Sequence, residues 1–241
     1  MSAQRLDEHK IIWEQKPALR AIYHDYYERI KGFTQPGLTL EIGGGTGNLK
    51  HYLPNVITSD ILPMPWLDAV CDAQALPFKD QSFDNMVAVD VLHHIQRPVR
   101  FLKEVQRLLR KGGRLVLLEP AITKLSWFFY HFLHPEPVLL KADPLLEGPL
   151  DPAREAFDAN QAIPELLFGS FYQAFQRQFP DLALIQKDYL SFFAYPLSGG
   201  FRPWSLVSPA MVDFLLKLER QLEKPWGKHL GFRLLLVLER S

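Results

Sequence analysis

Apolar residues near the N-terminus recur at helical spacing. Between residues 19 and 30 they lie three or four positions apart, so they share one helical face. The positions are Leu19, Ile22, Tyr23, Tyr26 and Ile30. This spacing predicts a helix or helix pair over residues 7–33, in which Pro17 occupies the first turn of the second segment.

After residue 37 the pattern changes to short apolar runs separated by Gly, Asp, Pro and amphipathic stretches. The runs predict five strands, at residues 38–42, 55–60, 69–72, 83–90 and 114–119. The stretches between them predict helices over residues 46–53 and 98–110, and a glycine in left-handed conformation closes the second. Strands that alternate with helices indicate a parallel sheet with helices on both faces.

Prolines break the C-terminal half into shorter predicted elements, with a Pro-rich run at residues 135–152. Helical spacing returns at residues 125–133 and 160–179, and Ser208-Pro209 is an N-cap followed by the first-turn proline of another helix. Residues 182–195 predict one long strand or a strand pair. Residues 231–239 predict a strong final strand.

Composition narrows the class of protein. The 241 residues include 27 Lys plus Arg and 27 Asp plus Glu, so the formal net charge is zero. Nucleic-acid-binding domains usually carry a basic excess, which argues against nucleic acid as the main partner. Cys71 is the only cysteine, which excludes an intramolecular disulfide and a cysteine zinc cluster, and we expect no metal. No apolar run is long enough for a transmembrane segment and the first residues are polar, so we expect a cytoplasmic protein.

A glycine-rich segment, Glu41-Ile42-Gly43-Gly44-Gly45-Thr46-Gly47-Asn48, follows the first predicted strand. Glycines let the backbone turn sharply and approach a ligand closely, and a following helix adds an anion-binding N-terminus. The nicotinamide fingerprint G-x-G-x-x-G does not fit, because no frame supplies the third glycine. The phosphate-loop pattern does not fit either, since no Gly-Lys-Ser/Thr follows. The pattern that fits is E-x-G-x-G-x-G.

Further segments follow this motif in an order that is typical of one protein family. Asp60 ends the second predicted strand, 19 residues after Glu41. The later segments are Asp72-Ala73 with Leu76-Pro77-Phe78, Val91-Leu92-His93-His94-Ile95, and Lys111-Gly112-Gly113-Arg114. With these motifs, residues 37–120 resemble the class I S-adenosylmethionine (SAM)-dependent methyltransferases, in particular their small-molecule type 11 group.

The resemblance implies an α/β fold, with a Rossmann-like, mostly parallel sheet of seven strands. One C-terminal strand is expected to be antiparallel, and helices are expected on both faces. A single domain is implied, in four parts. These are an N-terminal helical lid (1–36), the SAM-binding core (37–120), a helical insert that caps the acceptor side (121–181), and the C-terminal strands and helix (182–241).

The resemblance also implies SAM as cofactor, with S-adenosylhomocysteine (SAH) as product. The loop glycines would pass under the methionine part, and Glu41 would orient the loop and reach the amino group through water. Asp60 would hold the ribose hydroxyls, and each carboxylate also has a structural interpretation as a loop or turn cap. Ile61 would pack against the adenine face, Asp72 and Ala73 would lie at the adenine amino group, and Asp90 and Leu92 would border the methionine end. The implied cofactor-binding residues are thus Glu41, Gly43, Gly44, Gly45, Gly47, Asp60, Ile61, Asp72, Ala73, Asp90 and Leu92.

Two histidines after the fourth predicted strand are the candidate catalytic bases. SAM is an activated methyl donor, so the protein must mainly align the acceptor and exclude water. A neutral hydroxyl acceptor needs a base as well. His94 and His93 lie at the carboxyl edge of the predicted sheet, where α/β folds bind ligands, although either can simply pack there. Glu119 lies at the same edge and is a candidate acceptor contact.

Acceptor recognition is expected outside the core. Trp13, Arg20 and Tyr23 of the N-terminal helices are candidate contacts, and residues 195–202 form a glycine-hinged loop or a plain turn. The apolar stripe at residues 125–133 is a candidate membrane contact. Its only nearby base before Lys141 is Lys124, which argues against an anionic-lipid anchor.

We therefore expect methyl transfer from SAM to a small or medium acceptor, such as a sugar, a glycolipid or a secondary metabolite, with O-methylation favoured. The first alternative is a non-catalytic SAM-binding or scaffold protein with the same fold. The second alternative is a nicotinamide-dependent oxidoreductase. RNA methylation is disfavoured, because Asp90-Val91-Leu92-His93 stands where an Asn/Asp-Pro-Pro-Tyr-type segment is expected. The sequence leaves the acceptor, the methylated atom and a homodimer undetermined.

Overall fold

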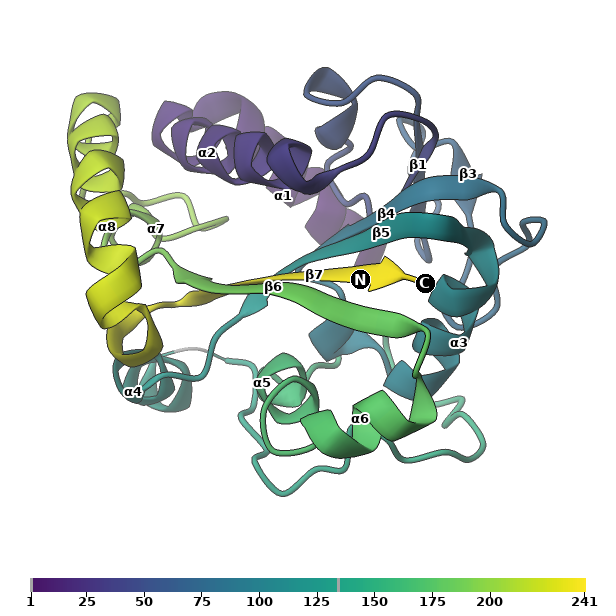
Figure 1. The fold of residues 1–241 in the computed structure, drawn as a ribbon. Coiled ribbons are helices and arrows are strands. Elements are labelled where there is room, and N and C mark those ends of the chain that lie inside the picture. Colours follow the sequence, from purple (N-terminus) through teal and green to yellow (C-terminus); the bar gives the residue numbers. More distant parts are fainter. Residues whose placement is uncertain (1, 134) are drawn as a thin grey trace.

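The computed structural model describes residues 2–133 and 135–241, and it contains one seven-stranded sheet (Figure 1). The strands are β1 (Thr39–Ile42), β2 (Val56–Asp60), β3 (Ala69–Val70), β4 (Phe83–Val89), β5 (Leu109–Pro120), β6 (Leu182–Leu190) and β7 (Arg233–Arg240). Their order is β3-β2-β1-β4-β5-β7-β6. Strand β7 is antiparallel to β5 and β6, and the other pairs are parallel. The predicted Rossmann-like sheet with one antiparallel C-terminal strand is confirmed.

Helices cover both faces of this sheet (Figure 1). They are α1 (Ser2–Gln15), α2 (Pro17–Phe33), α3 (Pro98–Leu108), α4 (Lys124–Phe132), α5 (Ile163–Leu167), α6 (Tyr172–Gln178), α7 (Ala194–Ser198) and α8 (Pro209–Leu230), with 3-10 turns η1 (Leu49–His51) and η2 (Leu92–His94). Neighbouring strand residues point to opposite faces. Met86 and Leu115 therefore join the core with α3 and α6, whereas Val87 and Val116 join the core with α2 and α8.

The expected helix over residues 46–53 is wrong, because only the short turn η1 forms there. Gly47 has a left-handed φ of 72°, and Pro54 disfavours helical backbone at the residue before it. Strand β2 begins two residues later, which leaves no room for a full helix. The dipole of a helix N-terminus is therefore not available to a ligand at the glycine loop.

The predicted end of the next helix is also corrected. Helix α3 ends at Leu108, two residues early, because Leu109 is extended and pairs with Phe83 of β4. Gly112 does have a left-handed φ of 74°, but it lies within β5 and does not cap the helix. The extra residues before Arg114 are accommodated as a register shift between β4 and β5.

Two other ambiguities of the C-terminal half are decided by the structure. The helix expected over residues 160–179 is two short helices, α5 and α6, because the chain turns at Gly169, where a Cβ would lie 2.4 Å from the carbonyl oxygen of Glu165. Residues 182–195 contain one strand, β6, which ends where Ser191 takes a φ of 63°. Ser208 caps α8 as predicted, since its hydroxyl accepts from the N–H of Met211 at 3.3 Å.

The architecture places several chemically interesting residues at one edge. Strands β1, β2 and β4 are parallel neighbours, so their carboxyl ends meet at the same edge of the sheet. Glycine 43, Asp60 and Asp90 stand at or directly after these three ends. In the described parts of the chain, no helix has both the length and the apolar character needed to span a bilayer.

Candidate functional site

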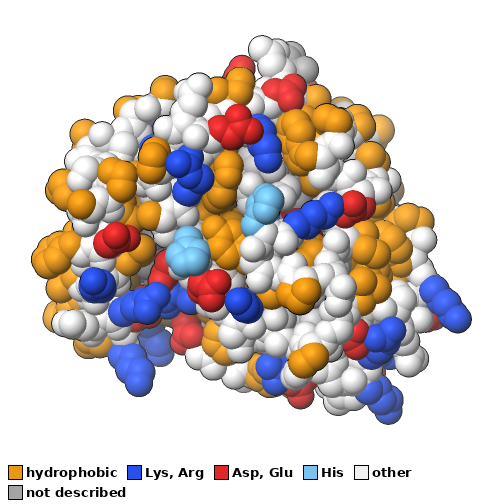
Figure 2. Space-filling view, turned by 90° about the horizontal axis from the view of Figure 1, so that it is seen from above, with side chains coloured by type: hydrophobic (Ala, Val, Ile, Leu, Met, Phe, Trp, Pro, Cys, Tyr) orange, Lys and Arg blue, Asp and Glu red, His pale blue; other side chains and the backbone are white. Residues whose placement is uncertain are grey.

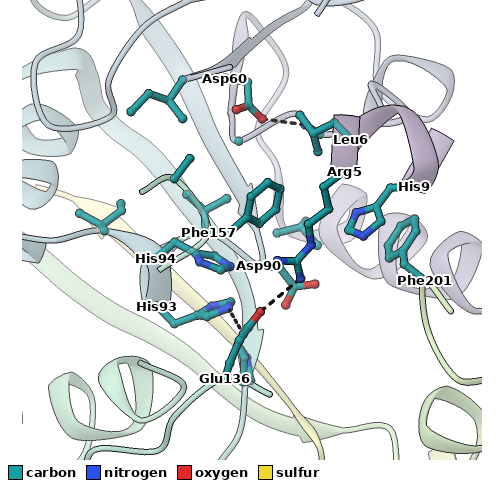
Figure 3. A pocket seen from close by; sticks show the side chains of 18 of the residues that line it. Arg5, Leu6, His9, Asp60, Asp90, His93, His94, Glu136, Phe157 and Phe201 are labelled. Atoms are coloured by element: carbon teal, nitrogen blue, oxygen red, sulfur yellow. Dashed lines mark hydrogen bonds and ion pairs between the residues drawn. The ribbon is translucent and has the colours of Figure 1, made fainter. Parts of the chain in front are cut away.

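A cavity of about 760 Å³ lies at this edge of the sheet (Figure 3). Its volume lies in the range of small-molecule and cofactor sites. One side is formed by the glycine loop and by residues 60–62 and 71–74. The other side includes α1, residues 93–96, the segment around Glu136 and Phe157, and the loop that carries Phe201. The cavity therefore joins the predicted cofactor side to a second, aromatic side.

The glycine loop has a conformation that side chains would disturb. Gly43 has a φ of 64°, and a Cβ there would lie 2.3 Å from Cγ2 of Val91. Gly43, Gly44 and Gly45 line the cavity. Gly47 does not, because it packs against Trp66, where a Cβ would lie 2.8 Å from Cδ1. The first three glycines therefore expose backbone to the cavity, where a ligand can approach it closely, and the fourth does not.

The carboxylates on the cofactor side also hold the loops in place. Oδ2 of Asp60 accepts from the N–H of Gly45, and its Oδ1 accepts from the N–H of Leu62, both at 3.0 Å. Asp72 accepts from the N–H of Gln74 at 2.8 Å. Asp60, Asp72, Ala73 and the half-exposed Ile61 all line the cavity. A carboxylate has about four lone-pair positions, so Asp60 can cap the loop and still accept from ligand hydroxyls.

Glu41 is the one buried carboxyl on the cofactor side with an oxygen that lacks a protein partner. It is 4% exposed and lines the cavity, and its Oε2 has no hydrogen-bond partner among the described residues. Burial, followed by the nearby Asp60, raises the pKa of Glu41 to about 8. A buried unpaired carboxyl is costly without a partner, and a ligand amino group would supply one. The residues present therefore fit SAM, whose methionine part carries such a group.

Replacing Glu41 with glutamine is expected to stabilise the ligand-free protein increasingly as the pH rises. The folded-state pKa of about 8 lies above the ordinary 4.5, so the stability that Glu41 contributes below its unfolded pKa is lost as the pH rises through 8. An amide does not titrate. The variant should therefore melt roughly 5–10 °C above the wild type at about pH 9 and close to it at about pH 4, as measured by thermal denaturation across pH.

The exposed Glu28→Gln variant is the matched control for this measurement, because its carboxyl lies in solvent on α2. It should follow the wild type at every pH. A melting difference for Glu41→Gln that stays constant from acid to alkaline pH would contradict the assignment of a raised pKa to Glu41.

Asp90 and Arg233 form an ion pair at the cavity, in which Arg233 is buried and the Asp90 side chain, 30% exposed, faces the cavity. Both guanidinium Nη atoms donate to the carboxylate at 2.6 Å, and Arg233 is 2% exposed. Burial alone would raise the pKa of Asp90, but the Arg233 guanidinium holds it below its ordinary value. The hydroxyl of Tyr23 donates to the same carboxylate at 3.4 Å. Asp90 thus lines the cavity as predicted, with its side chain engaged by the protein.

His93 is held between two carboxylates. Its Nδ1 lies 2.6 Å from Oε2 of Glu119, and its Nε2 lies 3.7 Å from Oε2 of Glu136. Burial opposes the charged form, yet the two carboxylates raise the pKa of His93 to about 9. A protonated imidazole cannot accept a proton, so the predicted role of His93 as a base is corrected.

Glu119 is likewise corrected from an acceptor contact to a positioning residue. It is fully buried and is not among the described residues that line the cavity. Its Oε1 accepts from the backbone N–H groups of Val91 and Leu92, at 2.9 and 2.8 Å. Through these contacts and the one to His93, Glu119 fixes the segment that follows β4.

His94 has the opposite protonation state. Burial and the adjacent His93 cation lower the pKa of His94 to about 4, so its ring is neutral near pH 7. Nδ1 lies 3.3 Å from the carbonyl oxygen of Asp158, which requires the proton on Nδ1 and leaves Nε2 as an acceptor. His94 lines the cavity beside Phe157, and it remains the candidate base (Figure 3).

His93, His94 and Glu136 also form a group whose potential metal-ligand atoms all lie within 4.8 Å of one another. The Glu136 carboxylate already accepts from the amide of Gln161 and lies 3.7 Å from the Arg5 guanidinium. A cation would have to compete with these contacts. The absence of a functional metal stays a prediction.

The aromatic side of the cavity is built from three distant segments. His9 of α1 stacks on Phe201 with ring centroids 4.6 Å apart, and the Arg5 guanidinium lies 4.2 Å over the ring of Phe157. Burial and Arg5 lower the pKa of His9 to about 4, so its ring is neutral. Sequence analysis named the loop at residues 195–202, which carries Phe201, but missed Arg5, His9 and Phe157, because no motif or periodicity relates positions so far apart.

A lysine between α1 and α2 holds the loop that carries Phe201. Lys16 is buried, and its Nζ donates to the carbonyl oxygens of Gly200, Arg202 and Trp204 at 2.7–2.9 Å. Lys10 similarly donates to the carbonyl oxygen of Thr46 at 2.8 Å, which ties α1 to the glycine loop. The N-terminal helices therefore cover the cavity through fixed contacts on both of its sides.

Besides Gly47 and Glu119, three further predicted site residues lie away from the cavity, namely Trp13, Arg20 and Leu92. Trp13 packs edge-on against Tyr23, and its carbonyl oxygen accepts from the Arg20 guanidinium at 2.8 Å, so both residues serve the joint between α1 and α2. Leu92 is fully buried in the core. None of the three is among the described lining residues, whereas Tyr23 is. Trp13 and Leu92 pack against other parts of the protein, so their apolar side chains are not available to a ligand.

Comparisons with known proteins identify the type of domain that forms the centre of the chain. Residues 40–117 match a family model described as a methyltransferase domain. The ubiquinone/menaquinone biosynthesis C-methyltransferase UbiE of Bordetella avium is 30% identical over 129 residues, which cover 41% of this chain and 50% of that protein. The probable tRNA methyltransferase 9B of Bos taurus is 45% identical over 126 residues, covering 45% and 28%. The chain thus spans half or less of the length of these curated relatives.

Solved structures share the whole fold at low sequence identity. A SAM-dependent methyltransferase of Thermotoga maritima, described as a possible histamine N-methyltransferase, has a TM-score of 0.57 at 18% identity and covers 93% of this chain and 92% of its own. A SAM-dependent methyltransferase of Archaeoglobus fulgidus has a TM-score of 0.54 at 13% identity, covering 92% and 94%. The matched domain contains the glycine loop, Asp60 and both histidines. The chain therefore contains a methyltransferase domain over residues 40–117 and has the fold of the SAM-dependent methyltransferases.

Proposed function

We propose that the protein transfers a methyl group from SAM to a small or medium acceptor, and that O-methylation is its reaction. The observation that carries this proposal is one continuous cavity, which joins the glycine loop of the methyltransferase domain to an aromatic wall beside a neutral histidine. A cofactor and an acceptor would meet inside it, sheltered from water by α1.

The cofactor half would hold SAM, which supplies an electrophilic methyl group on its sulfonium. Glu41 would accept from the amino group with its unpartnered oxygen, and Asp60 would accept from the ribose hydroxyls with its remaining lone pairs. Asp72 and Ala73 would face the adenine edge, and Ile61 would pack on the adenine ring. Gly43 to Gly45 would let the backbone approach the methionine part.

The acceptor half favours a ring-bearing metabolite with an acidic hydroxyl over a sugar. Phe157 and Phe201 offer aromatic faces, on which rings pack well. His94 is neutral and can take a proton at Nε2, but a pKa of about 4 makes it a weak base. A weak base suits an acceptor whose own O–H ionises readily.

The relatives carry names of other reactions, namely C-methylation in ubiquinone/menaquinone biosynthesis and probable tRNA methylation. We favour a small molecule over nucleic acid, because the net charge is zero and Lys and Arg side chains are interspersed with Asp and Glu on the face shown in Figure 2. The preserved glycine loop, Glu41 and Asp60 favour a working cofactor site over a scaffold protein.

Calorimetric titration with SAM and SAH, and with NADH as the competing cofactor, tests the cofactor assignment. We expect binding of both adenosyl ligands and none of NADH. Asp60→Ala should weaken binding by at least roughly tenfold, because it removes both the ribose contact and the cap on Gly45. Asp68→Ala is the matched control, since that carboxylate also accepts a backbone N–H, from Thr58, but does not line the cavity.

The outcomes separate the alternatives. A folded protein that binds neither SAM nor SAH would refute the methyltransferase proposal. Preference for NADH would favour the oxidoreductase. Adenosyl-ligand binding without methyl transfer to any acceptor in a broad screen of phenols, enols, sugars and tRNA would favour the scaffold protein.

A further inference from the structure

Arginine side chains from three segments line the acceptor side of the cavity. They are Arg5 of α1, Arg154 of the segment between α4 and α5, and Arg202 of the loop after α7. Arg5 lies 3.7 Å from a carboxylate oxygen of Glu136, whereas Arg154 and Arg202 form no ion pair with any residue that the structure describes. Arg202 is exposed to solvent, but Arg154 is partly buried. Arg154 is therefore the partly buried cation on this side that folding leaves without a counter-charge.

The guanidinium of Arg154 is held by backbone oxygens and keeps unused donors. Its Nη2 donates to the carbonyl oxygens of His94 and Asp158, at 3.0 and 3.1 Å. Its Nε is buried, and neither Nε nor Nη1 has a hydrogen-bond partner in the described parts of the chain. Burial lowers the pKa of Arg154, yet a guanidinium stays charged at neutral pH. Partial burial of a cation with unused donors is costly, and an anion bound here would offset that cost.

The carbonyl oxygen of Asp158 links this guanidinium to the candidate base. It accepts from Nη2 of Arg154 at 3.1 Å and lies 3.3 Å from Nδ1 of His94. Both side chains line the cavity, and the rings of His94 and Phe157 lie edge to face with centroids 6.2 Å apart. Figure 3 shows the Arg5 side chain extending into the same space. A ligand ring in this space would be close to the imidazole and to two positive charges.

The acidic side chains nearby do not neutralise Arg154. Asp151 and Glu155 also line the cavity, but both are exposed and neither comes within ion-pair distance of the guanidinium. Asp151 instead accepts from the backbone N–H of Ala153, and Asp158 accepts from that of Glu155, both at 2.9 Å. These turns fix the backbone on both sides of Arg154, so the guanidinium is already positioned before a ligand arrives.

We propose that the acceptor carries a carboxylate that pairs with Arg154, in addition to the hydroxyl that is methylated. This inference rests on the proposed function and narrows its acceptor to ring-bearing hydroxy acids. A guanidinium and a carboxylate form a planar, charge-assisted pair, which orients the ring as well as neutralising the charge. One unpaired guanidinium matches the single charge of a carboxylate, whereas a phosphate carries nearly two. Arg5 adds positive charge that attracts an anion to this side of the cavity.

Calorimetric titration of the protein in complex with SAH tests this inference. The probes are hydroxybenzoates, hydroxyphenylacetates and hydroxycinnamates, each compared with the amide of the same skeleton. An acid and its amide share the ring and the hydroxyl, so they differ mainly in charge. We expect at least one acid to bind roughly ten- to hundredfold more tightly than its amide, with a preference that decreases as salt is added.

Substitution of Arg154 assigns this preference to one side chain. Arg154→Gln should lose the preference, because the acid binds more weakly while the amide binds as before. Arg154→Lys should retain part of it, since lysine keeps the charge but not the planar fork. Arg97→Gln is the matched control and should keep the full preference. Arg97 also has a buried Nε without a partner and donates to backbone carbonyl oxygens, but it does not line the cavity.

The inference is overturned if the SAH complex binds none of the acids, if acids and amides bind equally well, or if Arg154→Gln keeps the preference. A methyl ester as the product, instead of a methyl ether, would also overturn it, because the carboxylate would then be the methylated group. SAH binding without selectivity for an acid refutes this inference alone. Absence of SAH binding refutes the proposed function and this inference with it.

Discussion

Replacing Arg233 with methionine is expected to destabilise the protein by about 2–4 kcal/mol, because the Asp90 carboxylate that loses its counter-charge is only partly exposed to water. The change keeps an unbranched apolar stem but removes the guanidinium that makes two 2.6 Å hydrogen bonds to Asp90. Asp90 then remains as a partly buried carboxylate without its counter-charge, next to Tyr23 and Tyr195. Denaturant unfolding of the ligand-free protein measures the loss.

Two comparisons isolate the cost of the unpaired charge. Adding Asp90→Asn to Arg233→Met removes that charge, so the double variant should recover much of the lost free energy of unfolding. Arg114→Met breaks a partly exposed pair with Glu239 and should cost under about 1 kcal/mol. If Arg233→Met and Arg114→Met lower the free energy of unfolding equally, the unpaired Asp90 carboxylate does not cause the loss and the prediction is wrong.

Replacing Gly43 with alanine is expected to cost about 2–4 kcal/mol of stability and to weaken SAM and SAH binding by roughly a hundredfold. The added Cβ meets Cγ2 of Val91 at 2.3 Å, and the backbone has a left-handed φ of 64°. Val91 is held from behind by Glu119, which accepts from its N–H. The loop must therefore move toward the cavity, into the space that a ligand needs. Calorimetry and denaturant unfolding measure the two effects.

Gly112→Ala is the matched control for backbone strain without a clash. Gly112 has a φ of 74°, and a Cβ there would meet nothing within 4 Å. This variant should lose only about 1–2 kcal/mol and bind SAM as the wild type does. If Gly43→Ala binds SAM with unchanged affinity, the glycine loop does not form the cofactor site that we propose.

The two adjacent histidines show how much chemistry depends on tertiary contacts. In the sequence His94 and His93 are both candidates for a base, with His94 placed first. In the structure, Glu119 and Glu136 keep His93 cationic, whereas burial and the neighbouring cation keep His94 neutral. Glu136 comes from a segment more than forty residues away in the chain. No local pattern could assign these opposite protonation states.

The sequence by itself determined the features that depend on neighbours along the chain. Alternating apolar runs and amphipathic stretches predicted a parallel sheet with helices on both faces, as the structure has it. The family resemblance carried by Glu41, the loop glycines and Asp60 implied a cofactor edge, and the cavity lies at that edge. Local propensity failed only where competing constraints act, as at Pro54, which shortens the helix after the glycine loop to one turn.

Only the tertiary structure decided what faces the cofactor edge and what faces outward. Lys16 holds a loop 184 residues away, and His9 stacks on Phe201 to form the acceptor wall. Trp226 joins the apolar stripe of α4 in the same way. These contacts arise because a sheet with helices on both faces brings remote segments together. They are selected by the free energy of side-chain packing in the folded protein, which the spacing of residues along the chain does not reveal.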